Sequence, residues 1–289
     1  MIYILMKLYN NVKLVSREQV VRLFKRAKVR SKAVDEVGQG YWIWWSGGEN
    51  GRRNGVAIVM DKKMTSRVMK VDVVSERIIK ATVRMEGTIM DIIQVYAPQT
   101  GCTDDEKREF EEDLERHVKE ERTIIIGDFN AQVGKFRQGY EEVMGCYGVG
   151  TRHLEEENLL DFCLRNDIVI GNIWNKKRES HKYTRYSWNG AQPSLIDYIL
   201  VRKCLQPYMA DVKVIPSESM EGDHRLVVAD FQRMRFGKDT CKRLTRIKTW
   251  KLKDTKVREE FVNNIRGGMD KFQECYSQSC RRNVWTNFR

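Results

Sequence analysis

A carboxylate and an amide follow an apolar run in the middle of the chain. The segment TIIIGDFNAQVG contains Asp128 and Asn130, which stand two residues apart and so project from the same side of an extended chain. Asp128 could orient a water molecule or accept a proton from it, and Asn130 could donate hydrogen bonds to a developing negative charge. The competing interpretation is an ordinary Asp/Asn turn at the end of a strand.

A second carboxylate and a histidine are also suited to acid–base chemistry. Asp197 interrupts the apolar run SLIDYILV, and Asp223 and His224 precede another apolar run. A buried carboxylate needs a partner, because leaving it unpaired is costly. That partner could be His224, whose tautomer a carboxylate can fix and whose pKa suits proton transfer near neutral pH. The alternatives are an arginine partner for Asp197 and an ordinary surface Asp-His dipeptide.

A tyrosine ends a further apolar run, in the segment QVYAP. The hydroxyl of Tyr96 could bind a phosphate oxygen, and the alternative is a tyrosine packed in the core. These clusters share one feature, which is a polar group at the end of an apolar run. In α/β proteins active sites gather at such strand ends, where the loops begin.

The pattern of apolar and charged segments predicts an α/β fold. Short runs rich in Ile and Val predict strands that are buried on both faces. Asp104–Glu120, with Thr103 as its N-cap, and Asn158–Asn166 predict amphipathic helices between the strands. This alternation indicates mixed sheets covered by helices, and beyond Arg233 one or two helices outside the domain. The predicted strands are Val56–Met60, Ile89–Tyr96, Thr123–Ile126, Ile168–Ile170, Leu195–Val201, Val212–Ile215 and Leu226–Phe231.

Positive charge is concentrated at the two ends of the chain. The net charge of +12 divides into +6 for residues 1–40, −3 for 41–234 and +9 for 235–289. Basic ends suit a polyanionic partner such as nucleic acid, because binding releases condensed counterions. The alternative is a solvated helical face or a flexible tail.

Composition excludes several classes of protein. The 289 residues are 41% hydrophobic, which is enough for a core and excludes a wholly disordered chain. No apolar run approaches about 18 residues, so we expect no membrane-spanning helix and no membrane partner. Seven cysteines without a CxxC pair predict reduced thiols in an intracellular protein, in the nucleus or the cytoplasm. Nothing in the sequence indicates the oligomeric state.

In their order and spacing, these segments resemble the exonuclease–endonuclease–phosphatase superfamily of metal-dependent phosphodiesterases. Within it they resemble the endonuclease domain of RTE-type non-LTR retrotransposons, often labelled craniofacial development protein 2-like. The resemblance covers residues 38–233, which leaves an atypical N-terminal segment at 1–37 and a basic helical tail at 234–289. The matching segments are SGGENGRRNGVAIV (46–59), IIQVYAP (92–98), IIIGDFNAQVG (124–134), LLDFCLRNDIVIGN (159–172), HKYT (181–184), SLIDYILV (194–201) and GDHRLVVADF (222–231).

The resemblance implies a sandwich of two mixed sheets with helices outside, and in-line hydrolysis of DNA phosphodiesters. Asp128 would align or deprotonate the attacking water, and Asn130 would help to hold that water or the phosphate. Tyr96 would contact the phosphate. Asp197 would orient His224, which would stabilise the charged phosphate or act as an acid or base.

The resemblance also implies a divalent metal, Mg²⁺ or Mn²⁺, and no small-molecule cofactor. Asp223 would lie in or near the metal site, because a hard cation prefers carboxylate and water ligands. Thr184 would help to line the substrate cleft. Arg185 stands where the family often has a tryptophan.

The start of the chain departs from the family pattern. The family begins with a strand that carries an asparagine and a second strand that carries a metal-binding glutamate. No strand pattern surrounds Asn11, and counting back without gaps from Ser31 places Lys25 at the glutamate position. A lysine cannot ligate Mg²⁺. We therefore expect the first strands of the family to be missing, which would leave an uncovered sheet edge.

Three interpretations of the function compete. The first is a metal-dependent DNA endonuclease that nicks its substrate, with an activity that the missing glutamate would reduce. The second is a catalytically degenerate remnant that still binds nucleic acid. The third is a phosphoinositide phosphatase-type hydrolase of the same superfamily. The local matches favour the endonuclease.

Overall fold

The computed structural model describes residues 4–8, 33–36, 41–47, 55–85, 88–118, 122–152, 156–187, 190–219, 223–232, 234, 255–264 and 266. The chain divides into two compact units, Met1–Thr245 and Arg246–Arg289. Among the described residues, no helix is both long enough and apolar enough to cross a membrane.

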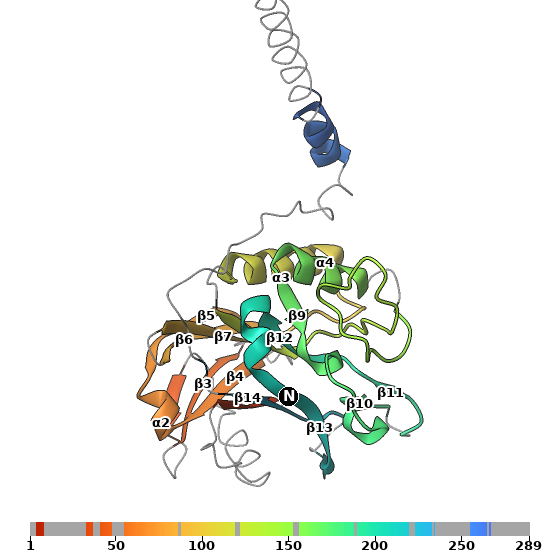
Figure 1. Cartoon of the computed structure of the whole chain (residues 1–289). Coiled ribbons are helices and arrows are strands. Elements are labelled where there is room, and N and C mark those ends of the chain that lie inside the picture. Colours follow the sequence, from red (N-terminus) through yellow and green to blue (C-terminus); the bar gives the residue numbers. More distant parts are fainter. Residues whose placement is uncertain are drawn as a thin grey trace, which may run out of the picture. The chain divides into compact units, whose positions relative to one another are not determined.

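A six-stranded sheet forms the centre of the first unit (Figure 1). Strands β7 and β8 pair in parallel, whereas all other neighbouring strands of this sheet pair in antiparallel, so the sheet is mixed. Every residue of β8 and of β12 is buried, as expected for apolar runs that are covered on both faces. In order across the sheet the strands are β5 (Val68–Ser75), β6 (Ile78–Met85), β7 (Thr88–Tyr96), β8 (Thr123–Asp128), β12 (Asp197–Arg202) and β9 (Ile168–Ile170).

Two three-stranded sheets provide the second layer of strands. One hydrophobic cluster contains Ile58, Val214 and Val227 from this layer together with Ile79 and Ile199 from the six-stranded sheet. The layers therefore pack face to face as a sandwich. The first small sheet has the order β1 (Ile4–Leu8), β14 (Arg225–Phe231), β13 (Met209–Ser219), and the second has the order β2 (Ala33–Glu36), β3 (Tyr41–Gly47), β4 (Gly55–Asp61).

Two helices, α3 (Asp104–His117) and α4 (Glu157–Arg165), cover the other face of the six-stranded sheet (Figure 1). Leu114 of α3 and Leu160 of α4 are buried in one cluster with Ile125 of β8. A capping box between Thr103 and Glu106 begins α3, as the sequence predicted for Thr103. The predicted mixed α/β fold class is thus confirmed.

Short elements complete the first unit. The helix α2 (Lys62–Thr65) follows β4, and β10 (Arg185–Tyr186) pairs with β11 (Pro193–Ser194) as a small ribbon. In the described part of the chain, 3-10 helices lie between the later strands at η2 (Gly171–Ile173), η3 (Glu179–His181) and η4 (Lys203–Tyr208).

The N-terminal segment contributes two strands that the sequence pattern did not indicate. β1 pairs with β14 in parallel, and β2 pairs with β3 in antiparallel register. As a result β14 has a strand on both sides, β1 and β13, and does not form a sheet edge. The predictions about Asn11 and Lys25 lie outside the described residues.

The second unit contains the helix predicted for the tail. It spans residues 255–264, and all of its side chains except that of Phe261 are exposed.

Candidate active site

Three of the predicted residues lie at one end of three adjacent strands. Tyr96 is the last residue of β7, Asp128 is the last residue of β8 and Asp197 is the first residue of β12. In the sheet register Asp128 lies directly opposite both Tyr96 and Asp197. The polar residues at the ends of the predicted strands therefore lie together at one end of the sheet.

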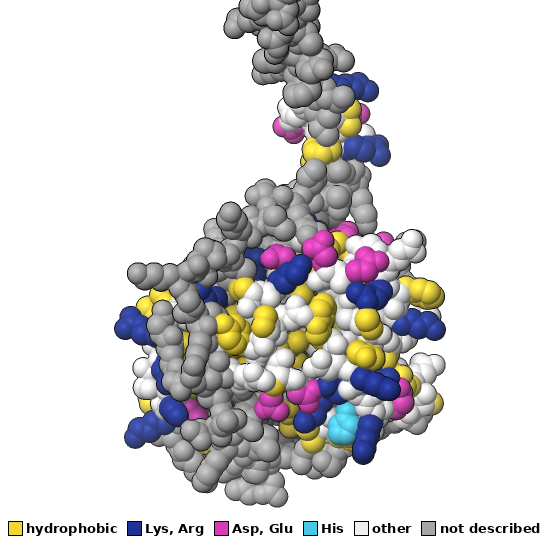
Figure 2. All heavy atoms as spheres, in the orientation of Figure 1, with side chains coloured by type: hydrophobic (Ala, Val, Ile, Leu, Met, Phe, Trp, Pro, Cys, Tyr) yellow, Lys and Arg dark blue, Asp and Glu magenta, His cyan; other side chains and the backbone are white. Residues whose placement is uncertain are grey.

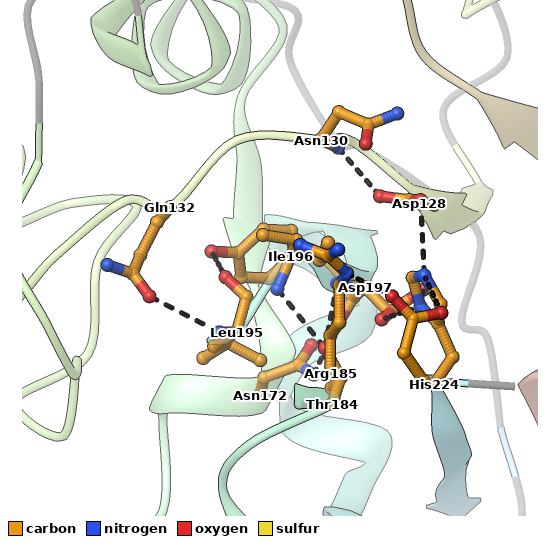
Figure 3. Close-up of polar contacts among 12 residues, drawn as sticks. Asp128, Asn130, Gln132, Asn172, Thr184, Arg185, Leu195, Ile196, Asp197 and His224 are labelled. Atoms are coloured by element: carbon orange, nitrogen blue, oxygen red, sulfur yellow. Dashed lines mark hydrogen bonds and ion pairs between the residues drawn. The ribbon is translucent and has the colours of Figure 1, made fainter. Parts of the chain in front are cut away.

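The fourth residue, His224, comes from the other layer of the sandwich and faces both carboxylates (Figure 3). Its Nδ1 lies 2.9 and 3.2 Å from the two carboxylate oxygens of Asp197. Its Nε2 lies 3.9 Å from Oδ2 of Asp128. The structure thus brings together an Asp–His–Asp array from segments that are far apart in the sequence.

Burial controls the protonation of this array. Burial raises the pKa of Asp128 to about 7, the charge of Asp197 adds to this effect, and His224 opposes it. Burial lowers the pKa of His224, but its hydrogen bond to Asp197 and the nearby carboxylate charges outweigh burial and raise that pKa. Near neutral pH the array can therefore both accept and hold protons, which is what acid–base catalysis requires.

Two polar side chains fix the backbone around Asp197. The buried Oγ1 of Thr184 accepts hydrogen bonds from the backbone N–H groups of Ile196 and Asp197, each at 3.1 Å. The amide of Asn172 donates to the carbonyl of Asp197 and accepts from the N–H of Ile199. Thr184, predicted to line the cleft, is completely buried here and contacts the chain that carries Asp197.

Asn130 lies next to Asp128 but presents its backbone to it. Its N–H donates to Oδ1 of Asp128 at 2.7 Å, and its side-chain amide donates to the carbonyl of Ala97 at 2.8 Å. The residue has a positive φ of 48°, which asparagine tolerates better than most residues. Asn130 therefore shapes the turn after β8 and orients the Asp128 carboxylate (Figure 3).

The hydroxyl of Tyr96 is held by a neighbouring side chain. It accepts a hydrogen bond from the amide of Gln99 at 2.8 Å, and the guanidinium of Arg77 lies 5.5 Å from the ring centre. Arg77 also donates to the carbonyl of Tyr96. The ring is thus fixed at the end of β7, in register with Asp128.

Asp223, the predicted metal-site residue, forms an ion pair with Arg185. Its Oδ2 accepts from Nε of Arg185 at 2.6 Å, and its Oδ1 lies 3.9 Å from Nε2 of His224. Burial raises the pKa of Asp223, but the hydrogen bond from Arg185 and the charges of His224 and Arg185 together outweigh burial, so the pKa lies below its usual value. Asp223 is therefore ionised at neutral pH.

The site has donors that suit a hard cation. One ligand atom from each of Asp128, Asp197 and His224 lies within 4.8 Å of the others. Both oxygens of Asp197 already contact His224, which leaves Asp128 and Asp223 as the better ligands. An oxygen of each lies 3.9 Å from the same atom, Nε2 of His224. Carboxylate oxygens and a buried negative charge fit a divalent cation such as Mg²⁺ or Mn²⁺.

Comparisons with known proteins agree with this geometry. A family model described as endonuclease-reverse transcriptase matches residues 90–228, which include the whole array. Craniofacial development protein 2 of Bos taurus and of Tragulus javanicus are each 30% identical to the chain over 196 residues, 66% of its length. The chain belongs to the exonuclease–endonuclease–phosphatase superfamily. It spans about one third of the length of these two curated relatives.

A solved structure shows the same fold. The endonuclease domain of TRAS1, a telomere-specific non-LTR retrotransposon, superposes with a TM-score of 0.55 at 14% sequence identity. The match covers 81% of this chain and 99% of that domain. At this identity the likeness concerns the arrangement of the strands and helices.

Sequence reasoning missed two residues of this superfamily site. Arg185 was noticed only as a departure from the family pattern, yet it forms an ion pair with Asp223 and its charge acts on Asp128. Asn172 follows the apolar run of β9, so it had the same strand-end signal as the predicted residues. That signal could have identified Asn172.

Proposed function

We propose that the chain is a divalent-metal-dependent phosphodiesterase that nicks DNA as an endonuclease of retrotransposon origin. The observation that carries this proposal is the Asp128–His224–Asp197 array at the ends of the strands. Superfamily membership supports a phosphodiesterase reaction. The basic ends of the chain support a polyanionic substrate, and action on genomic DNA would place the protein in the nucleus.

Each residue of the array has a distinct task in this reaction. Asp197 fixes the orientation of His224 through Nδ1, so that Nε2 is presented toward the substrate. Protonated His224 donates to a phosphate oxygen and stabilises the charge that develops there. Ionised Asp128 aligns the attacking water and accepts its proton. Tyr96 lies opposite Asp128 in the sheet register, and the N–H of Asn130 donates to the Asp128 carboxylate, so both residues lie beside this carboxylate.

Asp128 and Asp223 are the residues that would hold the cation. A bound Mg²⁺ or Mn²⁺ would supply positive charge against the phosphate. The ionised form of Asp128, which burial disfavours, is the form that such a cation needs. The chain's own contribution is then to bring these two carboxylates close to His224.

Nicking of supercoiled plasmid by the purified chain tests this function. We expect relaxed circles with Mg²⁺ or Mn²⁺ and none with EDTA. His224→Gln should reduce the rate by at least about a hundredfold, because it removes the charged donor. Glu142→Gln, at an exposed ion pair with Lys203, serves as the matched control and should nick at the wild-type rate.

Two outcomes would count against the proposal. Nicking that persists unchanged in His224→Gln would remove the array from the mechanism. A folded protein that binds DNA but nicks none would instead identify the chain as a catalytically degenerate nucleic-acid-binding member of the superfamily.

A further inference from the structure

The carboxylate of Asp223 lies between the side chains of Arg185 and His224. Its Oδ2 is 2.6 Å from Nε of Arg185 and its Oδ1 is 3.9 Å from Nε2 of His224. The side chains of Asp223 and Arg185 are 37% and 44% exposed, so this ion pair opens to solvent, whereas Asp197 is completely buried. An exposed carboxylate thus lies where the side chains of Arg185 and His224 converge.

The backbone fixes this arrangement from both sides. Arg185 and His224 form a bridge between β10 and the start of β14. The N–H of Tyr186 donates to the carbonyl of Asp223 at 2.9 Å, and the guanidinium of Arg225 lies 4.1 Å from the centre of the Tyr186 ring. The position of the Arg185 backbone relative to His224 therefore does not depend on the Arg185–Asp223 ion pair.

Arg185 and His224 have the chemistry of a phosphate site. The planar guanidinium presents several N–H donors that match the oxygens of a carboxylate or a phosphate. His224 is oriented through Nδ1, which leaves Nε2 directed toward Asp223 and Asp128. A carboxylate and a phosphodiester both offer two anionic oxygens, so each can take the same position between these donors.

We propose that Arg185 and His224 form a phosphate-binding site for the nucleic-acid substrate, in which the Asp223 carboxylate takes the place of the phosphate in the substrate-free protein. This inference rests on the proposed phosphodiesterase function. An incoming phosphate displaces Asp223 from Arg185. Asp223 thus competes with the substrate for Arg185, although the same carboxylate is suited to bind a cation once it is released.

Binding of a fluorescein-labelled DNA oligonucleotide in EDTA tests the site without catalysis. By fluorescence anisotropy we expect Arg185→Gln to weaken binding about tenfold, because it removes a charged donor. Asp223→Asn should tighten binding several-fold, because it removes the competing anion. In the Arg185→Gln background, Asp223→Asn should have a smaller effect. The matched controls are Arg108→Gln and Asp105→Asn, an exposed ion pair of similar form on α3.

The results separate this inference from the proposed function. Weaker or unchanged binding by Asp223→Asn, or an Arg185→Gln effect no larger than that of Arg108→Gln, would overturn the phosphate site. If Arg185→Gln unfolds by circular dichroism, Arg185→Lys replaces it, with the charge kept and an intermediate loss expected. Plasmid nicking without the predicted binding pattern would support the proposed function and contradict the phosphate site. The binding pattern without nicking would support the phosphate site and contradict the proposed function.

Discussion

At the scale of single residues, Asp128 shows how burial determines the chemistry of the site. Its carboxylate is enclosed at the end of β8, and burial with the charge of Asp197 raises its pKa to about 7. An ordinary exposed aspartate would be fully ionised at that pH and a weaker base. Two carboxylates directly opposite each other in the sheet register therefore produce one group that exchanges protons near neutrality.

The raised pKa of Asp128 predicts that stability falls as the pH rises. The folded protein binds this proton more tightly than the unfolded chain, so the contribution is present below about pH 4 and is lost as the pH rises through about 7. Each unit of pKa corresponds to about 1.4 kcal/mol. In thermal melts between pH 5.5 and 8, Asp128→Asn should lose less stability than the wild type. The raised pKa of His224 should cause a smaller decline in stability in both proteins. Equal declines in Asp128→Asn and in the wild type would contradict the raised pKa of Asp128.

Removing the charge of Asp197 should change His224 directly. The hydrogen bond and charge of Asp197 are the largest of the effects that raise the pKa of His224. We expect Asp197→Asn to lower that pKa in an NMR titration, with the histidine signal assigned by comparison with His224→Gln. The nicking rate should fall by about a hundredfold or more, because His224 loses both its charge and its orientation. An unchanged histidine titration would show that the two side chains are not coupled.

At the scale of elements, the site depends on how closely β7 and β8 approach each other. Gly127 precedes Asp128 in β8 and has a φ of 154°. A Cβ atom placed there would lie 2.0 Å from the carbonyl oxygen of Val95 in β7. Only glycine therefore lets the two parallel strands pair up to Asp128.

Gly127→Ala should destabilise the protein and misplace Asp128. The added Cβ would clash with the backbone carbonyl of Val95, so we expect a loss of about 1–3 kcal/mol in denaturant unfolding, together with slower nicking. Gly101→Ala is the matched control, because no atom lies within 4 Å of its added Cβ, and it should change stability by less than about 0.5 kcal/mol. Equal stability of the two variants would contradict the tight approach of the strands.

The strands predicted from the sequence come from runs in which most residues are apolar. The runs that became β4, β7, β8, β9, β12, β13 and β14 were predicted in this way. β5 and β6 were missed because Lys70, Asp72 and Lys80 interrupt their apolar positions in a two-residue alternation. The positioning by Thr184 and Asn172 was not predictable, because their hydrogen bonds join segments 12 to 27 residues apart.

At the scale of the whole molecule, most of the positive charge and the residues of the Asp128–His224–Asp197 array belong to different parts of the chain. On the face shown in Figure 2, acidic and basic side chains of the described residues are interspersed. This agrees with the net charge of −3 for residues 41–234, whereas residues 235–289 carry +9. Attraction of a polyanion should therefore depend strongly on the C-terminal residues.

Deleting residues 235–289 should weaken DNA binding and flatten its salt dependence. Fewer counterions are released when fewer basic side chains contact phosphates, so the slope of log affinity against log salt should become shallower. Anisotropy titrations at several salt concentrations measure this slope. The circular dichroism spectrum of the remaining residues 1–234 should show that the shortened protein is folded. An unchanged slope would mean that the tail is solvated and contacts no DNA.

The most direct test of the account is the single-turnover rate at which Asp128→Asn cleaves DNA with Mg²⁺. This change keeps the size of the side chain and an oxygen that can accept the Asn130 N–H, but it removes the charge that aligns and deprotonates water. We predict metal-dependent cleavage by the wild type and a loss of at least about a hundredfold in the folded variant. Cleavage by Asp128→Asn within about tenfold of the wild-type rate would contradict the central role assigned to the Asp128–His224–Asp197 array.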